Sequence, residues 1–190
     1  ATGTAFTLGD SGDTFTVPSG ATITNSGTAT GFGGGKVLQV VQTRWTGQSS
    51  TSSSSYTATP LASFQRTITP SATSSNVLIM AVLSVGMSTE TDHTYLKMYR
   101  DSTQINMGDQ LGSSRDRGTW NQKLGTNMGS MEPNPILYYD TEISTTSSVT
   151  YSFQVKTASV TAYFNQDNTG SDSAGYLTTA STLICIEIGA

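Results

Sequence analysis

Segments rich in β-branched and aromatic residues recur along the chain from Lys36 onward, and turn-forming residues separate them. Side chains of these types suit the pleated, half-buried surface of a sheet. About eight to ten such segments at this spacing are typical of an antiparallel β-sandwich or jelly roll. They cover residues 36–45, 56–69, 76–85, 94–100, 104–107, 136–139, 149–155, 160–164 and 182–188. The sequence therefore predicts an all-β, antiparallel, jelly-roll-like sandwich over residues 36–190.

Small hydroxyl side chains make up almost a third of the chain, with 33 Thr and 27 Ser among 190 residues. Charged residues contribute 12%, against about 25% in an average soluble domain. A protein built from long helices would instead draw on Ala, Glu, Lys, Leu and Arg. The composition thus agrees with the all-β prediction.

Three of these segments carry more specific predictions. The run 76–85 is almost continuously apolar and is followed by Gly86, which indicates a central strand covered on both faces. Pro60 is expected to interrupt the strand region at 56–69. Asp101 and Ser102 lie between two strand-like segments, which indicates a hairpin.

The first 35 residues differ from the rest. Short segments that combine apolar residues with Thr, at 6–8, 15–17 and 21–24, are too few to bury a core of their own. They predict an extended or β-solenoid-like stem that other copies or another protein stabilise, joined through a glycine-rich hinge at 31–35. The predicted domains are thus an anchoring segment, 1–35, and the sandwich, 36–190. The candidate anchor residues are Phe6, Leu8, Phe15, Val17 and Ile23.

The charge balance argues against several kinds of partner. Nine basic and thirteen acidic residues give a formal net charge of −4, and the basic residues form no run. Nucleic-acid binding would need a surface that neutralises phosphates, so we predict no nucleic-acid partner. The chain has no apolar run of membrane-spanning length and begins with no secretory signal pattern, so we expect synthesis in the cytoplasm and no membrane insertion.

The chain has few groups suited to catalysis. His93 is its one histidine and Cys185 its one cysteine. Cys185 lies in an apolar run, which predicts a buried thiol rather than a nucleophile. A Ser–His–Asp triad would need His93, which we expect in a solvated loop, and no nucleophile-elbow motif is present. We therefore predict no enzyme activity and no catalytic residue.

Two loops, 90–93 and 167–172, gather the oxygen ligands that a hard cation would require. Neither has the spacing of a known metal motif, and Asp, Asn, Gly and Ser are also ordinary turn residues. The glycine cluster before Lys36 departs from the phosphate-binding loop at two of its defining positions. No metal or cofactor site is predicted.

The stretch 108–135 is the longest part of the chain without a strand pattern, and we predict a surface loop system there. Arg115, Arg117 and Trp120 are its candidate recognition residues, because Arg and Trp are enriched among the residues that dominate interface energies.

A structural alternative exists for each of these residues. Trp120 could pack into the sandwich edge, while Arg115 and Arg117 pair with Asp109 and Asp116. Two methionines and two tyrosines further along the chain could form either part of the core or an apolar seam between subunits. They are Met128, Met131, Tyr138 and Tyr139.

Six stretches of the chain have recognisable wording. The first is GDTFTVPSGATITNSGTATGF, residues 12–32. The others lie in the sandwich and are VLQVVQ (37–42), TITPSATSSNVLI (67–79), YRDST (99–103), GD (108–109) and ASTLICIEIGA (180–190). Together they resemble the tail-fibre and virion structural proteins of marine tailed phages: the first is similar to the segment that precedes the distal domain in that family, and the others are similar to the family's C-terminal domain. The likeness covers most of the chain and departs at 118–134.

This resemblance implies a non-enzymatic protein on the virion surface, homotrimeric and attached to another virion protein of the tail or capsid by its N-terminal segment. One role would be a tail-fibre tip that binds a host surface glycan or protein. The alternative within the same class is a capsid decoration protein or head fibre. A hypothesis from another class is a carbohydrate-binding or carbohydrate-active domain.

Overall fold

The computed structural model describes residues 12, 14, 16–22, 24, 36–89, 92–123, 131–170 and 173–189. The chain divides into two units, Ala1–Gly33 and Gly34–Ala190. This division lies two residues before the predicted boundary at 35/36.

The described residues of the first unit contain a turn in which the Ala21 N–H donates to the Pro18 carbonyl at 3.1 Å, and none of them lies in a strand. Val17 is exposed. The other candidate anchor residues, Phe6, Leu8, Phe15 and Ile23, lie outside the described residues, as does the predicted hinge at 31–35. The prediction of a solenoid-like stem therefore concerns a part of the chain that is mostly outside them.

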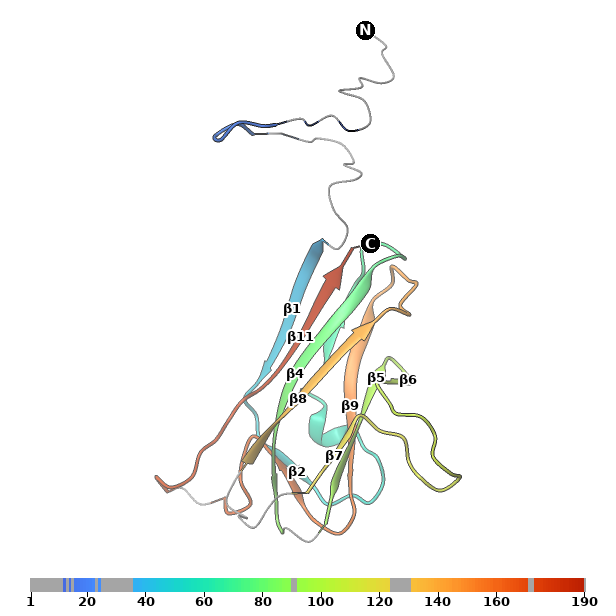
Figure 1. The fold of residues 1–190 in the computed structure, drawn as a ribbon. Coiled ribbons are helices and arrows are strands. Elements are labelled where there is room, and N and C mark those ends of the chain that lie inside the picture. The colour runs from blue at the N-terminus through green and yellow to red at the C-terminus, as the bar shows by residue number, and fades with distance from the viewer. Residues whose placement is uncertain are drawn as a thin grey trace. The chain divides into compact units, whose positions relative to one another are not determined.

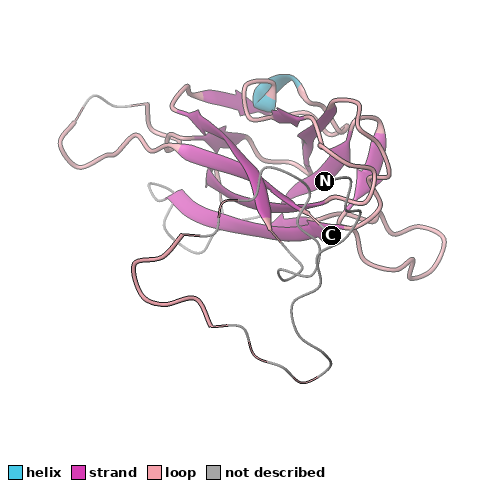
Figure 2. Cartoon of the chain, turned by 90° about the horizontal axis from the view of Figure 1, so that it is seen from above, coloured by secondary structure: helices cyan, strands magenta, loops and turns pink. Residues whose placement is uncertain are grey.

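The second unit is an antiparallel sandwich of two sheets (Figure 1), which lie one over the other when seen from above (Figure 2). The six-stranded sheet comprises β1 (Val37–Trp45), β2 (Ser49–Thr51), β4 (Asn76–Met87), β8 (Met131–Asp140), β10 (Ala162–Phe164) and β11 (Ser181–Ile188). The five-stranded sheet comprises β3 (Arg66–Ile68), β5 (Thr94–Arg100), β6 (Thr103–Ile105), β7 (Trp120–Gln122) and β9 (Val149–Thr157).

The strand order is that of a jelly roll. In one sheet, neighbouring strands follow the order β1-β11-β4-β8, and in the opposite sheet they follow the order β3-β9-β5-β6. Strands that follow one another along the chain mostly alternate between the two sheets. This is the double Greek-key arrangement. The all-β sandwich prediction is confirmed.

The core lies between the sheets because each long strand alternates inward and outward residues. In β9, Tyr151, Phe153 and Val155 are almost fully buried, and the residues between them are not. The Phe64 ring stacks on Phe153 with 5.2 Å between centroids, and Trp45 lies 6.0 Å from Phe64. These rings connect the two sheets.

The apolar run 76–85 forms a central strand, as predicted, but within this chain the strand is not covered on both faces. Strand β4 is central, with β11 and β10 on one edge and β8 on the other. Met80 and Val82 nevertheless point away from the core and are exposed. The strand also continues through Gly86, where a side chain could not fit because a Cβ would lie 2.8 Å from the Gln166 carbonyl oxygen.

The predictions for two further regions need correction. Pro60 interrupts the region 56–69, as predicted, and lies in a short 3-10 turn, Thr59–Leu61, but of this region only β3 is a strand. The region 108–135 is not all loop, because it contains β7 and the start of β8. The predicted hairpin is present between β5 and β6, with Asp101 at φ 52°.

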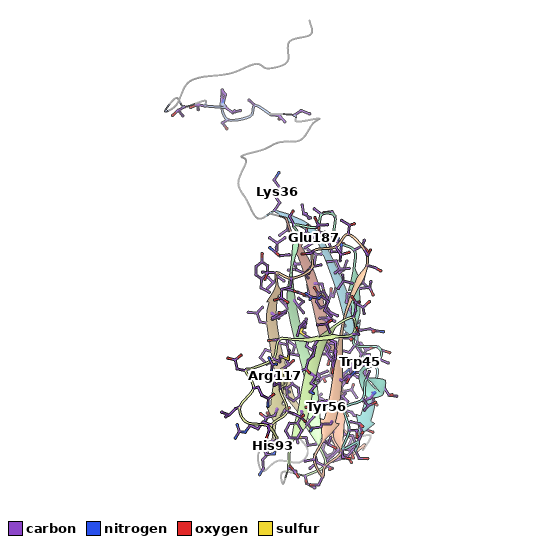
Figure 3. All side chains as sticks on the ribbon, turned by 90° about the vertical axis from the view of Figure 1, so that its right-hand side faces the viewer. Lys36, Trp45, Tyr56, His93, Arg117 and Glu187 are labelled. Carbon is purple, nitrogen blue, oxygen red and sulfur yellow. The ribbon has the colours of Figure 1, made fainter. Side chains whose placement is uncertain are left out.

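The chain enters and leaves the sandwich at one end, where the Gly189 N–H donates to the Lys36 carbonyl at 2.8 Å. Figure 3 shows Lys36 at this end and Tyr56, Arg117 and His93 in the opposite half. The loops that connect β4 to β5 and β6 to β7 therefore lie away from the point of entry.

Candidate functional site

A groove of about 590 Å³ lies on the outer side of the five-stranded sheet, beside the β6–β7 loop. We call this feature the groove. Its lining residues come from five segments of the chain and are Tyr56, Tyr95, Ser114, Arg115, Asp116, Gly118, Trp120, Asn121 and Lys156. Its volume falls within the range of about 300–1,000 Å³ that is usual for ligand sites.

Strand register explains why residues distant in sequence meet in the groove. Tyr95 of β5 lies opposite Lys156 of β9 on one side and opposite Asn121 of β7 on the other. Directly opposed residues in antiparallel strands project from the same face. Tyr56 joins this row because the adjacent Thr57 forms a bridge with β9.

Positive charge surrounds the ring of Tyr56. The ammonium of Lys97 lies 4.1 Å from the ring centroid and that of Lys156 lies 4.8 Å from it. Lys156 is also 5.2 Å from the Tyr95 centroid and donates a hydrogen bond to Asp116. The hydrogen bond from Lys156 lowers the pKa of Asp116, while burial and the nearby Asp116 charge raise the pKa of Tyr56 to about 12.

The β6–β7 loop is held in place by its own hydrogen bonds. Gln110 Nε2 donates to the carbonyls of Gly112 and Arg115, at 2.6 and 2.9 Å. Thr119 fixes the end of the loop to β5, because its Oγ1 accepts from the Met98 N–H at 2.9 Å. A loop pinned in this way presents its side chains in a defined arrangement.

The structure separates the three predicted recognition residues. Arg115 is exposed and lines the groove, and its guanidinium has no ion pair among the described residues. Arg117 lies outside the groove, where its Nε donates to the Gly108 carbonyl at 2.7 Å. Neither arginine forms the ion pair with Asp109 or Asp116 that was the structural alternative, and Asp116 pairs with Lys156 instead.

Trp120 combines the two roles that the sequence left as alternatives. It is half-buried, packs against the main hydrophobic cluster opposite Leu96, and also lines the groove. Tyr56, Tyr95 and Lys156 were missed as site residues. The alternation in 94–100 indicates that Tyr95 faces outward, but no pattern in the sequence connects Tyr56 or Lys156 with it.

A second candidate surface covers the outward side of the six-stranded sheet. Paired residues in β1, β11, β4 and β8 form rows across four strands, and two of the rows are Val40–Ile186–Leu78–Tyr139 and Gln42–Ile184–Met80–Leu137. We call this surface the apolar outer face. Its members are Val40, Leu78, Met80, Val82, Pro135, Leu137, Tyr139, Ile184 and Ile186.

Several of these side chains are strongly exposed. The exposed fraction is 68% for Leu137, 58% for Val40 and 44% for Met80. The solvent-facing side of an antiparallel sheet usually carries polar residues. Contiguous exposed apolar patches are a common feature of protein interaction sites.

The residues considered as either core or subunit seam divide between the core and the outward side of the sheet. Tyr138 packs against the core, whereas Tyr139 points outward on the apolar outer face. Met131 is half-buried and lies beside that face. Met128 lies outside the described residues.

The one histidine and the one cysteine have defined environments. His93 is half-buried rather than fully solvated, with Nδ1 3.3 Å from Asp92 Oδ1. Ser159 donates to the other oxygen of Asp92, so the carboxylate lies between the hydroxyl and the imidazole. In a Ser–His–Asp triad the imidazole occupies the middle position. Cys185 is fully buried, as predicted, and burial raises its pKa to about 12.

The loop residues considered as metal ligands make local hydrogen bonds. Asp167 Oδ1 accepts from the Thr169 backbone and hydroxyl at 2.8 and 2.6 Å. Within the described ranges, no three His, Cys, Asp or Glu side chains come together as a metal site would require. No helix in that part of the chain is both long and apolar enough to cross a bilayer.

Comparison with known proteins finds no protein-family model that matches the chain and no curated protein that is significantly similar to it.

Proposed function

We propose that this chain is a non-enzymatic surface protein of a phage particle, which associates with two further copies of itself through the apolar outer face. The observation that carries the proposal is that face, whose central residues are apolar across four strands. The location on a phage particle and the trimeric state are proposed from the sequence resemblance to phage virion proteins.

The dimensions of the apolar outer face suit the centre of an interface between copies. Strands about 4.8 Å apart and rows about 6.8 Å apart give four strands and three rows an area of roughly 400 Å². An ordinary interface buries about 800 Å² per partner, with a polar rim around an apolar centre. Gln42 and Arg44, the outward residues at the β1 edge, provide the beginning of such a rim.

Further copies of the same chain are the best-matched occupants. The face carries no acidic residue, so three copies turned towards a shared three-fold axis can meet without opposing like charges at their centre. Repeating one contact around a closed cyclic axis buries the face in every subunit. A chain with a net charge of −4 can associate in this way because its charges lie elsewhere.

The position of the chain entry supports display of the sandwich. Lys36 lies at one end of the sandwich, and Tyr56 and Arg117 lie in the opposite half (Figure 3). In the proposal, the segment 1–35 attaches to another virion protein while the far half faces outward. A tail-fibre tip is the leading location, and a capsid decoration protein or head fibre is the alternative.

The non-enzymatic part of the proposal is supported by two side chains. Cys185 is buried with a raised pKa, so the reactive thiolate is disfavoured. His93 contacts a carboxylate rather than a hydroxyl nucleophile among the described residues.

Immunogold labelling of purified phage particles tests the virion assignment. Antibodies raised against the sandwich should label the outside of intact particles. Gold restricted to the tail end would favour a fibre tip, and gold distributed over the head would favour decoration. Particles that lack the protein by both labelling and mass spectrometry would overturn the proposal.

A further inference from the structure

We propose that the groove binds an acidic polysaccharide, with a carboxylate or sulfate group of the sugar held by Arg115 and Lys156. This assignment names the ligand class for the display role proposed above, and it rests on that role for its biological setting. The binding chemistry itself follows from the residues of the groove.

The groove has an excess of positive charge within an acidic protein. Arg115 and Lys156 line the groove, and Lys97 lies beside them against Tyr56. Asp116 is the one carboxylate in the lining and accepts from one of the three N–H donors of Lys156, so Arg115 and Lys156 leave the lining with a net charge of +1. Arg115 has no ion pair among the described residues, so its guanidinium can donate to an anionic group.

The arrangement of these cations suits anion binding because they are partly fixed before a ligand arrives. Lys156 is held between the rings of Tyr56 and Tyr95 and by Asp116. Aromatic rings attract cations through their electron-rich faces. A side chain that is already ordered loses less conformational entropy on binding.

The remaining lining matches a sugar ring. Tyr95 projects outward and provides a flat aromatic surface on which the C–H face of a pyranose can pack, and the half-buried Trp120 lines the groove beside it. Asn121 and Ser114 provide donors and acceptors for ring hydroxyls. The groove volume of about 590 Å³ accommodates a short stretch of polymer, and its open sides allow the polymer to continue beyond it.

The same features argue against a nucleic-acid ligand. Proteins that bind single strands use a positively charged track along successive phosphates. Here the groove is lined by two basic residues, Arg115 and Lys156, and Asp116 lies between them in sequence and pairs with Lys156. A saccharide with one acidic group per ring or ring pair fits this limited charge better.

Titration of the full-length chain with defined oligosaccharides provides the test. Trp120 fluorescence reports binding in a Trp45→Phe background, in which the buried second tryptophan is removed. The probes are uronic acid hexamers, sulfated galactan hexamers, neutral glucan hexamers, inorganic sulfate and a single-stranded oligonucleotide. Uronic or sulfated hexamers should bind saturably and at least about tenfold more tightly than neutral hexamers. Added salt should lower the affinity for these acidic hexamers.

A matched pair of variants localises the binding. Arg115→Ala should weaken the acidic hexamer about tenfold, because it removes a charged donor from the groove. Arg117→Ala removes the same charge from the same loop but outside the groove, and should change affinity less than about twofold. Lys36→Ala, at the opposite end of the sandwich (Figure 3), controls for net charge. Unchanged melting temperatures show that the variants remain folded.

Several results would overturn the assignment. These are equal binding of neutral and acidic hexamers, tighter binding of the oligonucleotide, equal effects of Arg115→Ala and Arg117→Ala, or no saturation by any acidic hexamer below about 10 mM. Binding of inorganic sulfate as tightly as a hexamer would show an anion site without sugar recognition, which also contradicts it. The titration does not depend on particle location or on self-association, so its failure is distinguishable from failure of the proposed virion role.

Discussion

Glu187 carries a carboxylate that is fully buried, near the end of the sandwich where the chain enters (Figure 3). Gln39 donates to one oxygen at 2.6 Å, and the other accepts from Ser71 N, Ser71 Oγ and Ser75 Oγ at 2.7 Å each. Burial by itself would raise its pKa, but these hydrogen bonds outweigh burial and lower the pKa to about 2. The folded state therefore favours the charged form.

This lowered pKa predicts acid sensitivity. The stabilising contribution of Glu187 should be complete above its ordinary pKa of 4.5 and should be lost as pH falls towards 2. The difference between the two pKa values corresponds to roughly 3 kcal/mol in the free energy of unfolding. Urea denaturation across this pH range should show Glu187→Gln destabilised at pH 7 and less dependent on pH. A variant with the same pH dependence as the wild type would contradict this role.

Burial of the Cys185 thiol makes a second prediction. Cys185→Ser should lower the free energy of unfolding by roughly 1–3 kcal/mol, because it places a hydroxyl in an apolar layer. In the folded wild type, a thiol reagent should react with Cys185 only after unfolding in urea, since the pKa is raised to about 12. Rapid labelling of the native protein would show that the thiol is accessible.

The sequence predicts one of these two environments and not the other. Cys185 lies among apolar neighbours in a strand-like run, so its burial follows from local pattern. Glu187 is two residues further along the same strand, where alternation also points it inward, but its charge argues for exposure. Its partners, Ser71 and Ser75, come from the loop before β4, and their approach depends on tertiary structure.

At the scale of elements, a buried ion pair joins the two sheets. Arg100 of β5 donates to Asp140 of β8 at 2.6 Å, and the Tyr151 hydroxyl of β9 donates to the second oxygen at 2.9 Å. Asp140 is fully buried. Removing one partner of such a pair leaves an uncompensated charge inside the protein.

Asp140→Ala should therefore destabilise the sandwich by about 3–5 kcal/mol. The matched control is Glu142→Ala, since Glu142 lies 3.9 Å from the same guanidinium but its side chain is 75% exposed. That change should cost less than about 1 kcal/mol. Thermal and urea unfolding of both variants measure the difference in the free energy of unfolding. Similar decreases in the two variants would contradict the claim that burial of the Arg100–Asp140 pair determines the cost.

Most strands are predictable from the sequence because alternation and turn residues are local signals. The environment of β4 is not, since its outward residues Met80 and Val82 are as apolar as its inward ones. An apolar run indicates coverage on both faces, and the covering layer here is proposed to be another subunit. The groove was predicted only in part, through Arg115 and Trp120, because β5 and β9 bring Tyr95 and Lys156 together by register.

At the scale of the whole molecule, the sandwich should fold without the N-terminal segment. The buried hydrophobic cluster begins at Trp45, with Val41 packed against it, and includes no described residue of the first unit. Deletion of residues 1–33 should leave cooperative unfolding intact while abolishing incorporation into particles. Circular dichroism of the truncated protein and assembly assays measure the two outcomes. Loss of cooperative unfolding would mean that the segment stabilises the sandwich.

Self-association through the apolar outer face is the central claim for the whole molecule. Leu137→Glu introduces a charge at a residue of this face that is 68% exposed, whereas Thr103→Glu introduces the same charge on β6 of the other sheet. The first change should disrupt the interface, because a buried unpaired carboxylate is costly. The second should leave it intact.

Native mass spectrometry of the full-length chain tests this claim most directly. The wild type and Thr103→Glu should each have the mass of three chains, and Leu137→Glu should have the mass of one. A monomeric wild type, or a Leu137→Glu variant that remains trimeric, would contradict the claim that this face joins the subunits.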